Sequence, residues 1–102
     1  MSILEKTFKL AVKNHQESKV DIAADLYKKV LKINSNYTLA HNNLGVIFKQ
    51  LKQIREAKNC FEKAIETNPN YTRAHNNLGI ILKQLDQIQK AKNCFEKAIE
   101  TN

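Results

Sequence analysis

The chain of 102 residues has few of the residues that interrupt or cross-link a fold. It contains two glycines, one proline, two cysteines and no tryptophan. Because glycine and proline supply most tight turns, little turn chemistry is left, and abundant Ala, Leu, Ile, Lys, Glu and Gln favour helix. No apolar run approaches the ~20 residues of a transmembrane helix, so we exclude a membrane as a partner.

Catalytic and cofactor-binding patterns are also missing. The sequence shows no paired carboxylates, no nucleophile–base set and no glycine-rich phosphate loop, so we expect no enzymatic activity and no cofactor. His41 and His75 are the candidate metal ligands, but neither has a cysteine or carboxylate at ligand spacing. We therefore assign both histidines to packing and expect no metal site.

The dominant pattern is a repeat of 34 residues. The segment Asn36–Asn68 aligns without a gap on Asn70–Asn102, and 27 of the 33 aligned pairs are identical. A diverged copy covers about Leu4–Tyr37. A fixed period in this range indicates stacked supersecondary units, which bind partners along a surface and seldom catalyse reactions. We interpret residues 1–102 as a single domain with repeats at about 4–37, 38–71 and 72–102.

Each repeat is predicted to form two antiparallel helices. In the second repeat, apolar residues follow helical spacing from Ala40 to Leu51, and they resume it with a new phase from Ile54 to Ile65. Pro69 ends the second helix of the pair, since proline disfavours the α region for the residue before it. The prediction is an all-α helix-turn-helix solenoid of six helices.

Small and large residues predict how each pair packs. Gly45 faces Ala57 across the helix pair of the second repeat, and Gly79 holds the equivalent place in the third. A glycine inside a helix costs about 0.5–1 kcal/mol relative to alanine, which is tolerated where a neighbouring helix must approach closely. Phe61, Phe95 and, in the first repeat, Tyr27 are expected to fill the space between the units.

These residues resemble the tetratricopeptide repeat (TPR) family, which has a 34-residue period and the pattern W-x2-L-G-x2-Y…A-x3-F…P. The second repeat matches it with His41, Leu44, Gly45, Phe48, Ala57, Phe61 and Pro69. The third repeat follows the pattern up to its proline, and the first follows it more loosely. The resemblance covers essentially the whole chain and implies a right-handed superhelix. It also implies that the first helix of each repeat lines the concave side.

The turn between the paired helices departs from the family pattern. The family usually has glycine there, whereas the aligned residues here are Ser18, Lys52 and Asp86. This departure bears on the geometry of the turn and not on the fold.

The resemblance places the binding groove on the faces of the first helices that packing leaves free. These faces carry amide side chains, basic side chains and a few apolar side chains. The candidate peptide-binding residues are Asn42, Asn43, Val46, Lys49, Gln50, Arg73, Asn76, Asn77, Ile80, Lys83 and Gln84. The first repeat contributes Phe8, Lys9, Val12 and Gln16.

Asn43 and Asn77 occupy equivalent positions one repeat apart. A carboxamide both donates and accepts hydrogen bonds, so such a pair can hold successive amides of an extended peptide without reading its sequence. Their AHNNLG stretches resemble the asparagine ladder of O-linked GlcNAc transferases, in which aligned asparagines hold the substrate backbone. Lys9 breaks the ladder in the first repeat. The alternative is that both asparagines are solvated helix residues copied by duplication.

We therefore expect a protein-interaction scaffold that binds an extended peptide in its concave groove. Two alternatives stay open: the substrate-recruiting arm of a larger transferase, and a self-associating assembly module. Some TPR domains clamp a C-terminal carboxylate with lysine, asparagine and arginine. Asn43 and Arg73 align with two of those places, but Phe8, Val12 and Asn77 fill others, and the incomplete clamp argues against chaperone-tail binding.

The formal net charge of +7 is spread along the chain without a basic block or tail. Such a balance favours acidic partners in general. Lys49, Arg73 and Lys83 could follow a phosphate backbone, but the groove has no aromatic side chain for stacking bases except Phe8. We expect a protein or peptide partner, and the pattern does not favour nucleic acid.

The two cysteines, Cys60 and Cys94, lie at equivalent places in neighbouring repeats. Neighbouring helix axes are about 8–10 Å apart, whereas a disulfide needs Cα atoms within about 7 Å. We expect free thiols at the edge of the core, which suggest a reducing compartment. The N-terminal segment carries Glu5 and three lysines where a secretory signal is apolar, so we predict a cytoplasmic location.

The last predicted helix carries Ile88, Cys94, Phe95 and Ile99, and no capping helix covers it. We therefore expect a piece of a longer array or an engineered piece. The open end predicts end-to-end association. The near-identical second and third repeats also favour a homo-oligomer that exchanges units.

Overall fold

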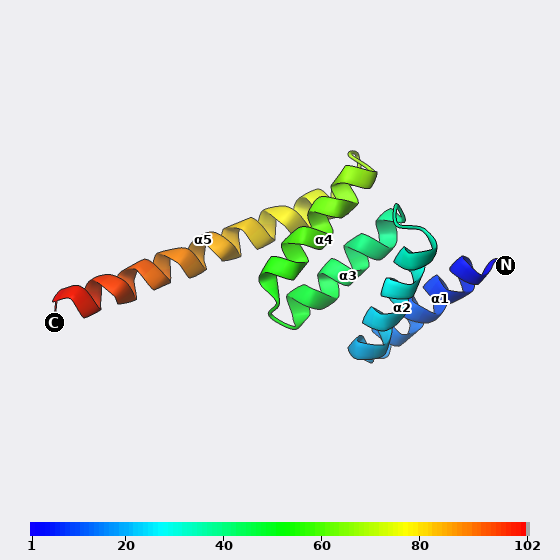
Figure 1. The fold of residues 1–102 in the computed structure, drawn as a ribbon, viewed down its shortest axis with the longest axis horizontal. Helices are drawn as coiled ribbons and strands as arrows, with labels where there is room; N and C mark the ends of the chain where they lie inside the picture. The colour runs from blue at the N-terminus through cyan, green and yellow to red at the C-terminus, as the bar shows by residue number, and fades with distance from the viewer. Residues whose placement is uncertain (102) are drawn as a thin grey trace.

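The computed structural model describes residues 1–101, with side chains through Glu100, and this part of the chain forms helices and short connections alone. The helices are α1 (Ile3–Gln16), α2 (Val20–Ile33), α3 (Thr38–Gln50), α4 (Ile54–Thr67) and α5 (Thr72–Thr101). α1 packs against α2 and α3 against α4 as two hairpins, and α5 follows beside α4 (Figure 1). The prediction of an all-α solenoid is confirmed.

The same turn closes both hairpins. Ser18 and Lys52 each adopt a left-handed backbone conformation with φ of 63°. In the second hairpin, the Gln53 N–H donates to the carbonyl oxygen of Phe48 at 2.8 Å, which satisfies one of the last carbonyls of α3. A residue other than glycine costs on the order of 1 kcal/mol in this conformation, so packing within the hairpin must offset the strain.

The two histidines fix the start of α3 and α5 to the preceding loop. His41 Nε2 donates to the carbonyl oxygen of Ser35 at 2.7 Å, and His75 Nε2 donates to that of Pro69 at 2.7 Å. His41 is buried, whereas His75 is exposed. The packing role that we predicted for both histidines holds for His41 and is wrong for the exposed His75, although the same hydrogen bond to the preceding loop recurs there.

The core of the second hairpin depends on Gly45. A Cβ atom at Gly45 would lie 2.6 Å from Cε1 of Phe61 and 2.9 Å from two further ring atoms. The Phe61 side chain is fully buried and packs with Ala57 of α4 and Ile81 of α5. The predicted close approach at Gly45 is confirmed, and the Phe61 ring joins the second repeat to α5.

The prediction of six helices is wrong, because residues 72–101 form one helix, α5, where we expected two. Asp86, which aligns with the turn residues Ser18 and Lys52, lies inside this helix. No atom lies within 4 Å of a Cβ built at Gly79, and Phe95 is 71% exposed. We expected Phe95 to fill the space between repeat units, and its exposure shows that it has no such packing among the described residues.

Sequence differences around the expected bend favour a continuous helix. Three of the six differences between the close repeats fall here, where Asp86, Gln89 and Lys90 replace Lys52, Arg55 and Glu56. Lys90 Nζ lies 3.0 Å from Asp86 Oδ2, and Gln89 Nε2 donates to Asn93 Oδ1 at 3.1 Å. Pairs four residues apart stabilise a helix by about 0.2–0.5 kcal/mol each. A bend at Asp86 would lose the Asp86–Lys90 pair and place Asp86 in the left-handed conformation, whereas Gln89 and Asn93 would both remain in the helix that follows the bend.

The continuous α5 makes the molecule long. Its extents are 63 × 29 × 20 Å, and the second half of α5 projects away from the four other helices (Figure 1). None of the helices in the described range is both long and apolar enough to span a membrane.

We predict that Gly45→Ala lowers the free energy of unfolding by about 1–2 kcal/mol, because a new Cβ displaces the buried Phe61 ring. The higher helix propensity of alanine offsets only about 0.5–1 kcal/mol of the clash. Urea unfolding followed by circular dichroism measures the loss. In a Phe61→Leu background the same substitution should cost much less, since the ring is gone. An equal loss in both backgrounds would contradict the proposed contact.

Candidate peptide-binding site

The first helices of the repeats, α1, α3 and α5, are joined by side-chain hydrogen bonds. His15 Nε2 of α1 donates to Gln50 Oε1 of α3 at 3.2 Å. Asn77 Nδ2 of α5 donates to Asn42 Oδ1 of α3 at 3.1 Å. These two bonds connect α3 to α1 on one side and to α5 on the other.

The predicted groove residues differ in exposure. Solvent reaches one set freely: Gln50, Arg73, Asn76, Ile80 and Lys83. A second set is half-buried: Asn43, Val46, Lys49, Asn77 and Gln84. Asn42 is only 3% exposed, so it supports the surface from beneath and does not face a ligand.

A row of hydrogen-bonded polar side chains runs from α2 across α3 to α5. Asn43 Nδ2 donates to the Tyr27 hydroxyl at 3.3 Å, and Asn42 Nδ2 donates to Asn43 Oδ1 at 3.5 Å. The bond from Asn77 to Asn42 extends the row to α5. We call Tyr27, Asn43, Asn42 and Asn77 the amide row. It fixes the orientation of both asparagines that we predicted to contact a peptide.

The sequence analysis missed Tyr27 as a member of this row. Tyr27 occupies the place that Phe61 and Phe95 hold in the later repeats, so its hydroxyl was the available signal. Burial raises the pKa of Tyr27, and the hydrogen bond from Asn43 partly opposes this effect. The phenol therefore stays neutral throughout the physiological pH range, and its oxygen accepts the hydrogen bond from Asn43 Nδ2.

Both outer asparagines of the row keep hydrogen-bonding capacity. A carboxamide offers two N–H donors and an oxygen with two lone pairs. Asn43 uses one N–H toward Tyr27 and one lone pair toward Asn42, and Asn77 uses one N–H toward Asn42. The remaining groups are of the kind that pairs with a peptide backbone, and the contact itself stays a prediction.

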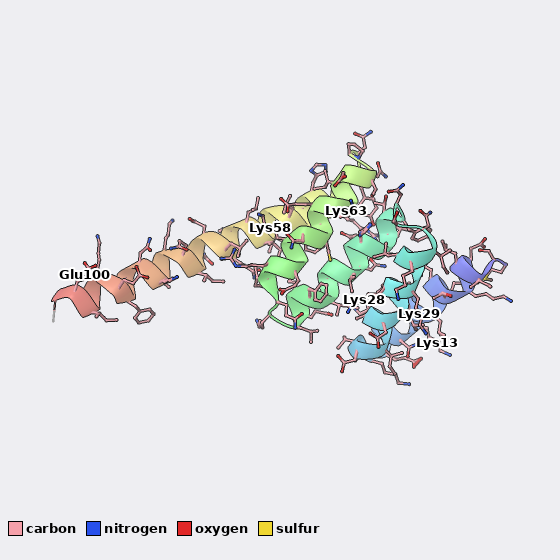
Figure 2. The ribbon with its side chains drawn as sticks, in the orientation of Figure 1. Lys13, Lys28, Lys29, Lys58, Lys63 and Glu100 are labelled. Carbon is pink, nitrogen blue, oxygen red and sulfur yellow. The ribbon has the colours of Figure 1, made fainter. Side chains whose placement is uncertain are left out.

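Positive charge is present on the groove but is not confined to it. Lys49, Arg73 and Lys83 take part in none of the ion pairs between described side chains. The second helices also carry lysines, among them Lys28 on α2 and Lys58 on α4 (Figure 2). The charge of the groove can therefore attract an acidic ligand, but charge alone does not select this face.

A shallow recess lies beside the predicted groove, between the α3–α4 turn and the middle of α5. It is lined by Lys52, Ile54, Gln84, Gln87 and Ile88. The Gln84 Oε1 atom is buried and has no hydrogen-bond partner among the described residues. Of the predicted groove residues, only Gln84 lines this recess, so the two surfaces meet at that side chain.

The cysteines are free, as predicted, but their surroundings differ. Cys60 is half-buried, and burial raises its pKa to about 11, with Lys28 partly opposing the shift. Cys94 is exposed because the second half of α5 has no neighbouring helix, so the expected core-edge position holds only for Cys60. Within the described residues, no three His, Cys, Asp or Glu side chains gather as metal ligands would.

We predict that Asn42→Ala lowers the free energy of unfolding by about 1–2 kcal/mol, because it removes the buried centre of the amide row. Asn76→Ala is the matched control, since Asn76 is exposed in α5, and it should change stability by less than about 0.5 kcal/mol. Chemical denaturation of both variants provides the comparison. Similar losses for the two would show that the row contributes nothing to stability.

Two models of the tetratricopeptide repeat match the chain, one at residues 38–71 and one at residues 60–93. No curated protein sequence matches the chain. Among solved structures, MamA is similar with a TM-score of 0.79 and 24% identity over 95% of this chain. The second TPR of Spaghetti (RPAP3), bound to the HSP90 peptide SRMEEVD, has a TM-score of 0.78 and 19% identity over 91% of this chain.

The lengths of these similar proteins differ. The chain spans 57% of the MamA chain and 86% of the second Spaghetti TPR. At such identities the likeness concerns the fold. The two repeat models together cover residues 38–93, which is more than half of the 102 residues and includes the Gly45–Phe61 contact. The chain therefore belongs to the tetratricopeptide repeat family.

Proposed function

We propose that this protein is an interaction scaffold that binds an extended peptide across α1, α3 and α5. The observation that carries the proposal is the amide row, which holds Asn43 and Asn77 in fixed orientations with hydrogen-bonding groups to spare. Membership of the TPR family supports an interaction scaffold in general. The free hydrogen-bonding groups of Asn43 and Asn77 in the amide row favour an extended peptide backbone as the ligand.

Preorganisation makes the two carboxamides effective contacts. Ordering a side chain at an interface costs about 0.5–1.5 kcal/mol, and the bonds to Tyr27 and Asn42 hold the asparagines before a ligand arrives. Neighbouring helices lie about 8–10 Å apart, and an extended chain advances about 3.3 Å per residue. Asn43 and Asn77 would therefore meet peptide amides about three residues apart.

The charges on the same helices favour an acidic peptide. Arg73 and Lys83 are exposed on α5, and Lys49 lies half-buried on α3. The Spaghetti TPR domains provide a parallel, because both are bound to the peptide SRMEEVD, which contains adjacent glutamates. In this chain Phe8 and Val12 occupy two places where the carboxylate clamp has polar residues. We therefore propose an internal acidic segment as the ligand and not a free C-terminus.

A recruiting arm of a larger transferase would use the same surface to hold its substrate. The two functions differ in whether a catalytic domain is attached, and the peptide-binding step is common to both. We propose a cytoplasmic setting for this step, because Cys60 and Cys94 are free thiols.

The test is peptide binding by Asn43→Ala/Asn77→Ala. Extended acidic peptides selected from a display library against the wild-type chain serve as the probes. We expect the double substitution to weaken binding about tenfold or more, because it removes hydrogen bonds to the peptide backbone. Fluorescence anisotropy gives the dissociation constants, and circular dichroism checks that the helices remain.

Asn59→Ala is the matched control, since Asn59 is exposed on α4 away from the amide row, and it should bind like the wild type. Peptides with an amidated C-terminus should also bind unchanged if the ligand is an internal segment. Equal affinity of the wild type and the double variant would remove the asparagines from the site.

A further inference from the structure

The second half of α5 exposes apolar side chains that are covered at the equivalent places of the second repeat. Ile88 is 55%, Phe95 71% and Ile99 75% exposed. The equivalent side chains in α4 are Ile54, Phe61 and Ile65, all of them buried or half-buried. The structure of the second repeat therefore shows what kind of surface covers this face, namely the first helix of a repeat.

The first half of α5 is such a surface: one face packs on α4 and buries Ile81, and the face that carries Gly79 is uncovered. Gly45 receives the Phe61 ring so closely that a Cβ there would lie 2.6 Å from it, whereas nothing lies within 4 Å of a Cβ at Gly79. Leu82, three residues further along, is 47% exposed. The two halves of α5 thus carry complementary surfaces, the one presenting Gly79 and the other presenting Phe95.

The two surfaces cannot meet within one continuous helix. Gly79 and Phe95 are 16 residues apart in α5, which corresponds to about 24 Å along the helix axis. Figure 1 shows the second half of α5 extending clear of the other helices, and in Figure 2 Glu100 lies near its far end. A second molecule therefore has access to the Gly79 face of the first half and to the Phe95 face of the second half.

We propose that two copies of this chain pair their α5 helices antiparallel, so that residues 88–101 of each copy complete the third repeat of the other. In the second repeat, Gly45 lies opposite Phe61, and the midpoint of the pair is Gln53. By the same offset, Gly79 lies opposite Phe95 of the second copy, and the midpoint is Gln87. The arrangement is two-fold symmetric and closed, as an isologous interface requires.

The region around Asp86 favours exchange, in which residues 88–101 pack on a second copy. It disfavours closure, in which they fold back on the first half of α5 in the same chain. Closure would turn Asp86 into the left-handed conformation seen at Lys52, and it would break the Asp86–Lys90 ion pair. Exchange buries the same apolar side chains and keeps the helix intact. The paired state is therefore preferred wherever the concentration is high enough to offset the entropy of association. This inference does not depend on peptide binding.

The test measures mass and thiol protection over a concentration series. Sedimentation equilibrium should show a transition from the 11.7 kDa chain to twice that mass. Alkylation of Cys94 should slow over the same range, because in the pair it takes the half-buried position of Cys60. A monomer with reactive Cys94 at all concentrations would overturn the proposal. A monomer with protected Cys94 would indicate that the third repeat closes within one chain, which also overturns the proposal. Open-ended oligomers would overturn it as well, because the proposed pair is closed.

Gly79→Ala tests the contact itself. A Cβ at this position meets nothing in the single chain, so helicity should be kept or raised, but in the pair it meets Phe95 of the second copy. We expect the dimer dissociation constant to rise about tenfold or more. Glu96→Ala is the matched control, because the equivalent Glu62 stays exposed in the closed repeat, and it should leave the constant unchanged. Equal constants for wild type and Gly79→Ala would contradict the pairing.

Asp86→Gly tests the bend. Glycine adopts the left-handed conformation without strain, so this variant should close its own third repeat. The expected result is a monomer whose Cys94 is protected at every concentration. If Asp86→Gly still dimerises as strongly as the wild type, the helix at Asp86 does not control the exchange and the proposal fails.

Discussion

The contact between the Phe61 ring and Gly45 is the interaction on which the rest of this structure depends. The ring can be fully buried only because residue 45 has no side chain, and it reaches Ile81 of the next unit at the same time. It thereby closes the α3–α4 hairpin and fixes α5 beside it. Burial of this ring also helps to offset the strained backbone at Lys52, which the turn of the hairpin requires.

The same packing sets the position of the polar surface. Because α5 rests on α4 and α3, Asn77 comes within hydrogen-bond distance of Asn42, and the amide row continues from one repeat to the next. The buried Asn42 orients its neighbours, and the half-exposed Asn43 and Asn77 face outward. A repeat scaffold of this kind achieves a rigid binding surface without a deep pocket, since the rigidity comes from the stacking of the units.

Most of the fold and part of the site could be predicted from the sequence. Helical periodicity located α1 to α4, and Gly45 with Ala57 predicted the close approach of α3 and α4, although the side chain that lies against Gly45 is Phe61. The amide row could not be found in the same way, because it joins Tyr27 of one repeat to Asn77 two repeats later. Asn42 also appeared to be a surface residue by pattern alone, whereas its neighbours in space bury it.

The sequence by itself determined the repeat, the helical class and the family, because these follow from the local spacing of apolar and small residues. Tertiary structure decided whether the third repeat closes, and the Asp86–Lys90 ion pair adds a local preference for the continuous helix. Residues 38–67 and 72–101 are nearly the same sequence, yet one folds into a hairpin and the other into a single helix. The hairpin of the second repeat is packed between α2 and α5, and those contacts offset the turn at Lys52. Within residues 1–101 no helix packs on the second half of α5, so the contacts that offset the turn at Lys52 have no counterpart at Asp86.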